Sequence, residues 1–402
     1  MMAAGALRRI AALGCALALA CFGGHAAAQS RPVVVGVVLP QTGMLADLGA
    51  GMRDALLLWQ ERVNAAGGLA GRKVELRIHD DASEAVRSTR LYELLVREDR
   101  AEILIGPFGS AATSMAAAVA DRARRVMVNA TGTSPAIHKR AFRYVFQVPP
   151  PSDAYAAGLL PLAQRAGART LTVAASNPAG ATALGDLLKS DALKRGVVLQ
   201  PAAIYEGGGV VDLAPFAAAL KAAGVEALAS PADVRETANL LRGLRAAGYT
   251  PRLFAAQGVG DPAFVAQAGI DAEFALGFSN YEPNARSSGN AEFVRAYRAR
   301  YKRAPDFHAA CGWAAAQIVE AAVARAGSFD QAALRVALAT LESASVLGAY
   351  KVDVDGAQIG AQPLMVQIQK GRREVVWPEA AASAAAALPA QPWGERALQP
   401  KK

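Results

Sequence analysis

The stretch over residues 101–135 constrains the fold most, because two short apolar runs flank a helical segment within it. The first run, residues 103–105, stops at a Gly-Pro pair, which is typical of a buried parallel strand ended by a breaker. Ser110 follows at the position expected for the N-cap of the helix. The second run, residues 126–128, ends in a Thr-Gly-Thr-Ser-Pro cluster. This order predicts a strand–helix–strand unit of a parallel α/β sheet.

Both predicted strand ends are polar, and parallel strands place their carboxyl ends at one edge of a sheet. Ligands of doubly wound sheets bind beyond that edge. The free N–H groups in the first turn of a helix also suit a carboxylate. Ser110, Thr131 and Thr133 therefore form a candidate site for a small anion. The alternative, that these hydroxyls only cap helices and turn the chain, stays open at this point.

The N-terminus predicts export. Arg8 and Arg9 precede an apolar run over residues 10–22, and three alanines end at position 28, as before a signal-peptidase site. We expect residues 1–28 to be a cleaved signal peptide and the mature chain to be soluble and exported, since no later stretch approaches the length of a spanning helix. A lipoprotein anchored through Cys21 is a second interpretation, ranked lower because the residues before Cys21 make a poor lipobox.

The composition argues against metal, disulfide and nucleic-acid chemistry. Removal of the signal leaves Cys311 as the single cysteine, and the three remaining histidines lack ligand spacing, so we expect neither a metal nor another cofactor. The formal charge of +9 includes the two signal arginines, so the mature chain carries about +7. Its basic residues are scattered and only 6% of residues are aromatic, which argues against a nucleic-acid-binding face.

Strands and helices alternate along roughly 370 mature residues, which exceeds one ordinary core and predicts two α/β domains. A proline-stiffened connection over residues 146–151 marks the first boundary. A second sheet is expected from strands at 170–175, 197–205, 227–230 and 253–256. Helices at 290–301, 308–326 and 331–341 are assigned to the first domain. The Ala- and Pro-rich segment 379–402 has no periodicity and is predicted to be a disordered tail.

Several elements together resemble one family. They are the strand from Val35 to Thr42-Gly43, the glycine-rich element over residues 64–73, Asp80-Asp81, Ile105-Gly106-Pro107 and the Thr-Gly-Thr-Ser-Pro cluster. In order and spacing they resemble the periplasmic leucine/isoleucine/valine-binding proteins, the substrate-binding components of branched-chain amino acid ABC transporters. The resemblance runs from about Val33 to Trp377.

This resemblance implies an α/β fold of the type I periplasmic binding proteins, with two Rossmann-like lobes and a hinged cleft between them. Lobe 1 is expected at 31–147 plus 278–347, and lobe 2 at 148–277 plus 348–378. The chain is expected to cross between the lobes near Gln147, Gly277 and Gly348.

The family's ligand-binding positions carry over to lobe 1 as follows. Ser110 matches the serine that holds the ligand carboxylate through its hydroxyl and N–H. Thr131 falls where a backbone carbonyl faces the ligand amino group, and Thr133 matches a threonine that contacts both ends of an amino acid. Two positions depart from the family pattern, since Leu48 replaces a first-loop tyrosine and His308 replaces an aromatic residue of the side-chain pocket.

The second lobe departs further. The family glutamate that pairs with the ligand ammonium falls at Gln257, which is neutral and cannot neutralise an ammonium. Another family aromatic falls near Asp233, which could supply the missing charge or only cap the helix from Val234. If Asp233 does not compensate, a carboxylate without an amino group is expected to bind more tightly than leucine.

The resemblance implies an exported, monomeric solute-binding protein. It would capture a branched-chain amino acid or a related aliphatic or aromatic acid and deliver it to an ABC-transporter permease. Delivery to a membrane receptor as a sensing protein is the alternative. An enzyme is not expected, because the short glycine motifs form no dinucleotide fingerprint and no Gly-x-Ser-x-Gly elbow occurs.

Overall fold

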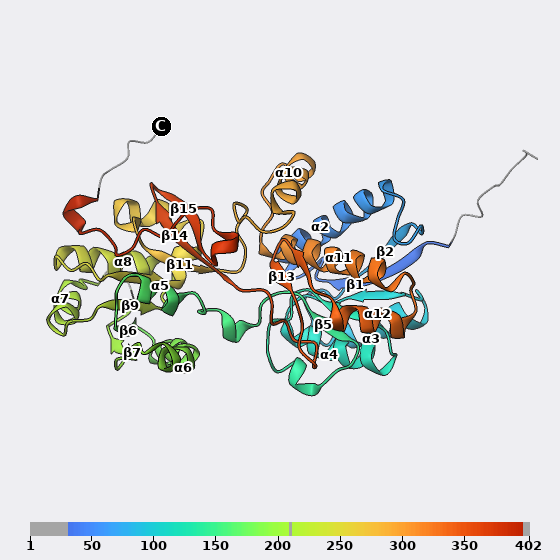
Figure 1. The fold of residues 1–402 in the computed structure, drawn as a ribbon, viewed down its shortest axis with the longest axis horizontal. Helices are drawn as coiled ribbons and strands as arrows, with labels where there is room; N and C mark the ends of the chain where they lie inside the picture. Colours follow the sequence, from blue (N-terminus) through green and yellow to red (C-terminus); the bar gives the residue numbers. More distant parts are fainter. Residues whose placement is uncertain (1–30, 209–210, 397–402) are drawn as a thin grey trace, which may run out of the picture.

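The computed structural model describes residues 31–208 and 211–396, which form two α/β lobes. Figure 1 shows the lobes side by side along the long axis, with the first lobe on the right and several passages of the chain between them. The predicted signal peptide and Cys21 lie outside the described residues. Within 31–208 and 211–396, no helix combines the length and the apolar character that crossing a membrane requires.

The first lobe is built on a five-stranded parallel sheet in the order β2-β1-β3-β4-β5. Alternate residues of the inner strand β1, such as Val35 and Val37, pack with α2 and α11, while Val34 and Val38 pack with α3 and α4. Burial on both faces explains the unbroken apolar sequence of this strand. The elements are β1 (Val33–Leu39), α2 (Ala46–Ala65), β2 (Val74–Asp80), α3 (Arg87–Arg97), β3 (Ile103–Ile105), α4 (Ser110–Arg122), β4 (Met127–Asn129), β5 (Val145–Gln147), α10 (Asn290–Tyr301), α11 (Phe307–Ala326) and α12 (Gln331–Thr340).

The second lobe is built on an eight-stranded sheet, in which α5 and α6 cover one face and α7, α8 and α9 cover the other. The single strand expected over 197–205 is instead two short strands, because Pro201 between them has no N–H to donate to the ladder. The elements are α5 (Leu159–Arg165), β6 (Thr170–Ala175), α6 (Pro178–Arg195), β7 (Val198–Leu199), β8 (Ala203–Ile204), α7 (Ala214–Ala222), β9 (Ala227–Ser230), α8 (Val234–Ala246), β10 (Leu253–Ala256), α9 (Phe264–Ala268), β11 (Leu276–Ser279), β14 (Leu364–Gln369) and β15 (Arg372–Trp377).

Two of the expected lobe boundaries are displaced. The boundary at residue 278 falls inside β11, whose last residues still pair with β14 in the second sheet. The boundary at 348 falls inside a hairpin of β12 (Ser343–Ser345) and β13 (Gly348–Tyr350), and Tyr350 and Val352 are buried in the core of the first lobe. The hairpin is anchored there by these apolar side chains, and the chain stays on the first lobe as far as Gln358, whose Nε2 donates to the Val148 carbonyl at 2.9 Å.

The segment 379–396 is not a disordered tail. Trp393 donates from Nε1 to the Tyr249 carbonyl at 2.8 Å, and the Ala390 N–H donates to the Arg252 carbonyl at 2.9 Å. Leu388 packs against the core of the second lobe. The prediction of disorder was wrong over these residues because aperiodic chain can still be fixed by hydrogen bonds to a folded surface. Residues 397–402 lie outside the described part.

We expect Trp393→Ala to lower the free energy of unfolding by about 2 kcal/mol, because it removes a partly buried indole and its hydrogen bond. Urea unfolding followed by circular dichroism measures the change. Gln391→Ala, at an exposed position two residues earlier, serves as the control and should have no measurable effect. Equal stability of the two variants would show that this segment does not pack in solution.

Candidate functional site

The carboxyl edge of the first sheet brings Ser110, Thr131 and Thr133 together on two neighbouring loops. The structure corrects the expected N-cap, which is Gly109 rather than Ser110. Gly109 has φ 83° and ψ 159°, a conformation that only glycine adopts readily. The helix therefore begins at Ser110, and the Ser110 hydroxyl accepts a hydrogen bond from the Ser134 N–H at 3.2 Å. This bond links the loop after β3 to the loop after β4.

The Thr131 side chain forms hydrogen bonds within the protein. Its buried hydroxyl donates to the Pro107 carbonyl at 2.7 Å and accepts from the Gly109 N–H at 2.8 Å. Only the backbone of Thr131 is therefore available to contact a ligand. Thr133 differs, since its hydroxyl has no hydrogen-bond partner among the described residues, while its carbonyl accepts from the Ser152 N–H at 2.9 Å on the first passage between the lobes.

The β1–α2 loop at the same edge is held by Asp80. Its carboxylate accepts from the N–H groups of Gln41 at 2.8 Å and Ala82 at 2.8 Å, and from the Thr42 hydroxyl at 2.7 Å. Partial desolvation opposes ionisation, but these hydrogen bonds prevail and lower the pKa of Asp80 to about 2. Leu48 follows this loop in the first turn of α2 with 40% of its surface exposed.

His308 lies in the first turn of α11, beside the Ser110 loop. Its ring centroid is 4.7 Å from that of Phe108, and its Nδ1 atom is buried without a hydrogen-bond partner in the described part of the chain. Desolvation lowers the pKa of His308, against the opposing effect of Asp306, so the ring is neutral at pH 7. His308 therefore presents a largely apolar, uncharged surface near the candidate site.

Gln257 and Asp233 lie together at the carboxyl edge of the second sheet, after β10 and β9. Both side chains are exposed. Asp233 is the N-cap of α8 and accepts from the Glu236 N–H at 2.9 Å. The Gly258 N–H donates to the Ala232 carbonyl at 2.9 Å, which holds the Gln257 turn against the start of α8. The capping interpretation of Asp233 is thus confirmed, although capping occupies only one carboxylate oxygen.

The two groups of residues remain apart in this structure. Among the described residues, no hydrogen bond or ion pair joins Ser110, Thr131 or Thr133 to Gln257 or Asp233. Figure 1 shows the corresponding strand edges on separate lobes.

Comparison with known proteins identifies the family. A family model described as periplasmic binding protein matches residues 32–373. The chain belongs to the periplasmic binding protein family. Its two α/β lobes are those of the type I substrate-binding proteins of ABC transporters.

The chain is similar over nearly its whole length to named relatives. It is 24% identical to the Leu/Ile/Val-binding protein homolog 7 of Brucella melitensis, covering 93% of this chain and 98% of that one. A substrate-binding protein from Desulfitobacterium hafniense, solved in complex with Leu, superposes with a TM-score of 0.67 at 23% identity, over 86% of this chain and all of that one. A solute-binding protein from R. palustris in complex with benzoate superposes with a TM-score of 0.61 at 19% identity, over 90% of this chain and 99% of that one.

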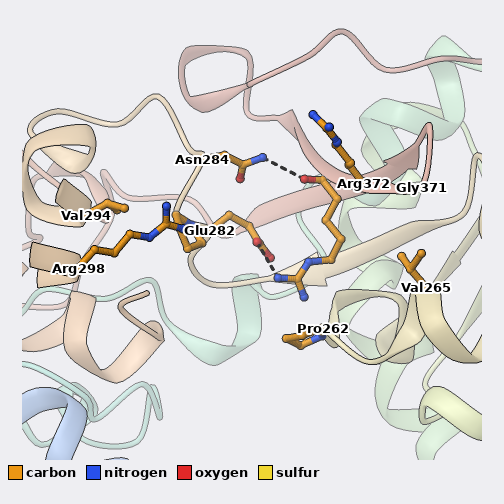
Figure 2. Close-up of a pocket in the computed structure, with 10 residues that line it drawn as sticks. Pro262, Val265, Glu282, Asn284, Val294, Arg298, Gly371 and Arg372 are labelled. Carbon is orange, nitrogen blue, oxygen red and sulfur yellow. Dashed lines mark hydrogen bonds and ion pairs between the residues drawn. The ribbon is translucent and has the colours of Figure 1, made fainter. Parts of the chain in front are cut away.

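A cavity of about 510 Å³ lies at the second passage between the lobes of this binding protein. Figure 2 shows it between Val294 and Arg298 of α10 and Arg372 of β15, with Glu282 at its centre. Glu282 is buried and pairs with Arg373 at 3.1 Å. Burial raises the pKa of Glu282, and Arg373 offsets part of that shift. None of the predicted site residues lines this cavity, so it belongs to the passage rather than to the strand edges.

Sequence reasoning missed three further polar residues at the second-lobe edge, Ser176, Tyr205 and Glu236. Glu236 follows Asp233 by three residues, a spacing typical of a capping box and therefore of a purely local role. In the structure its side chain instead contacts Ser176 on another strand end. Within the described part of the chain, no group of three or more metal-ligating side chains occurs.

We expect Asp80→Asn to destabilise the protein at pH 7 by about 1 kcal/mol, because the amide weakens the hydrogen bonds that hold the β1–α2 loop. The native pKa of Asp80 lies below its unfolded value, so its contribution is complete above pH 3.8 and is lost as the pH falls toward 2. Urea midpoints measured from pH 7 downward should therefore converge for the two proteins. Asp186→Asn, at an exposed carboxylate, is the control. A difference in urea midpoint that stays the same at every pH would contradict a stabilising role for the ionised Asp80 carboxylate.

Proposed function

We propose that this protein is an exported solute-binding protein that captures a small carboxylate between its lobes and delivers it to an ABC importer. The ligand is a branched-chain amino acid or a related aliphatic or aromatic acid. Cleavage of residues 1–28 releases the protein into the periplasm, where it acts as a monomer without catalytic activity. Similar solved proteins named for branched-chain amino acid ABC transport support delivery to an importer rather than to a receptor.

The hydrogen bond between Ser110 and Ser134 carries this proposal, because it places three kinds of carboxylate donor at one edge. These are the Ser110 hydroxyl, the Thr133 hydroxyl and the free N–H groups in the first turn of α4. A helix N-terminus with adjacent hydroxyls stabilises a bound carboxylate. Two similar proteins were solved with a carboxylate ligand, one with leucine and one with benzoate, which supports a carboxylate as the shared feature.

Thermal-shift screening with leucine, phenylalanine, benzoate, 4-methyl-2-oxopentanoate and phenylpyruvate tests the proposal. A ligand at one hundred times its dissociation constant adds about 2.7 kcal/mol of stability. Ser110→Ala and Thr133→Ala are each expected to weaken binding of the best ligand by about 1.5 to 3 kcal/mol, the range for a hydrogen bond to a charged group. Calorimetry measures this loss. Ser114→Ala, one turn further along α4, should retain wild-type affinity. Unchanged affinity in both site variants would show that the ligand carboxylate does not bind at this edge.

Binding is expected to close the lobes, because residues of both lobes contact one ligand only in a closed arrangement. Small-angle X-ray scattering with and without a saturating ligand from the screen measures the radius of gyration, which should fall on binding. A radius that does not change at saturation would indicate a rigid, preformed site within one lobe.

A further inference from the structure

The carboxyl edge of the second sheet holds a polar cluster beside Gln257. We define the Glu236 cluster as Ser176, Tyr205, Ser230 and Glu236. Ser176, Tyr205 and Ser230 come from the ends of β6, β8 and β9, which are neighbours in the sheet, and Glu236 comes from the first turn of α8. The sheet order therefore brings together three strand ends, from residues 176 to 230, and the helix that directly follows the last of them.

The Glu236 carboxylate is held but not neutralised. The Ser176 hydroxyl lies 2.9 Å from one of its oxygens and 2.8 Å from the other. A hydroxyl donates only one proton, so the carboxylate keeps most of its capacity to accept hydrogen bonds. No Lys, Arg or His in the described residues forms an ion pair with Glu236 or with the neighbouring Asp233. Two carboxylates without a cation at one edge favour a positively charged ligand group.

Tyr205 supplies independent evidence that the cluster is built to accept a further polar group. Its side chain is only 6% exposed, and its hydroxyl lies beside Ser176 and Ser230 without completing a hydrogen bond within the described residues. Burial, together with the Glu236 charge, raises the pKa of Tyr205 to about 12, so this hydroxyl keeps its proton at neutral pH. Native proteins rarely leave a buried hydroxyl unpaired. The protein itself thus leaves hydrogen-bonding capacity unused directly beside the Glu236 carboxylate.

The cluster also lies where a ligand would meet the second lobe. A Cβ atom on Gly258 would come within 2.5 Å of the Asp233 backbone, so the Gln257 turn packs directly on the N-terminus of α8. Gln257, Asp233 and Glu236 therefore occupy one edge. Gln257 is neutral, and one oxygen of Asp233 is occupied by the helix cap. The Glu236 carboxylate, in contrast, is already oriented by the Ser176 hydroxyl at the end of a second-lobe strand.

We propose that Glu236, oriented by Ser176, receives the ammonium group of the ligand and thereby selects an α-amino acid over the corresponding keto acid. This inference rests on the proposed function and narrows its ligand class. The Tyr205 hydroxyl, unpaired within the described residues, lies beside this carboxylate and leaves hydrogen-bonding capacity for the same polar ligand group. The carboxylate of the ligand remains with Ser110 and Thr133 on the other lobe.

Matched ligand pairs test the proposal. The dissociation constants of leucine and 4-methyl-2-oxopentanoate, and of phenylalanine and phenylpyruvate, are measured by calorimetry for wild-type protein and Glu236→Gln. The wild type is expected to prefer the amino acid in at least one pair. Glu236→Gln should weaken binding of that amino acid by about tenfold or more, the effect of losing a charge-assisted contact. Binding of the keto acid should stay unchanged or become tighter, because a negative charge has been removed.

Three further variants separate charge recognition from structure. Ser176→Ala frees the carboxylate and should give a smaller loss for the amino acid alone. Glu206→Gln neutralises an exposed carboxylate next to Tyr205 and should have no effect on either ligand. Asp233→Asn should leave the preference intact.

Each contrary outcome has a defined meaning. Equal losses for both members of a pair in Glu236→Gln would show a structural role and overturn the inference. A wild type that binds keto acids as tightly as amino acids would overturn it while leaving the proposed function in place. Loss of preference in Asp233→Asn but not in Glu236→Gln would assign the ammonium to Asp233 instead. If the wild type binds no carboxylate of the panel, the proposed function itself fails.

Discussion

The Thr131 hydroxyl holds the first-lobe site together, because it bridges the two strand-end loops from which that site is made. It donates to the Pro107 carbonyl through a buried bond and accepts from the Gly109 N–H through a partly buried one. Asn129 reinforces the second loop by bonding both backbone groups of Gly132. With the loops fixed in this way, the start of α4 and the Thr133 hydroxyl are presented together. A hydroxyl that looks like a ligand contact in sequence thus acts mainly as the support of its neighbours.

The two lobes contribute different chemistry to the candidate site. The first lobe offers hydrogen-bond donors and a helix N-terminus, which suit a negative group. The second lobe offers the Asp233 and Glu236 carboxylates, which suit a positive group. A zwitterion is complementary to this division, whereas a simple acid uses only the first lobe.

The passages between the lobes are stabilised by contacts that the sequence does not reveal. Glu282 and Arg373 are 91 residues apart, yet they form a partly buried ion pair at the second passage. The segment beyond Pro378 returns along the second lobe, where the Gln367 side chain bonds to Ala387 in both directions. These contacts depend on which surfaces meet in space, and a polar or aperiodic sequence gives no indication of them.

The sequence by itself determined the alternation of strands and helices, the two-lobe fold and the position of Ser110 and Thr133 at one edge of the first sheet. These follow from local patterns, since apolar runs, glycine turns and strand-end hydroxyls have the same consequences wherever they occur. Leu56 and Trp59 lie on one face of α2 at helical spacing and are both fully buried. Only the tertiary structure decided that Gly109 caps α4, that residues 379–396 pack on the second lobe, and that Glu236 turns toward Ser176. Each of these depends on a backbone angle or on a partner distant in the chain, and neither quantity is encoded in local spacing.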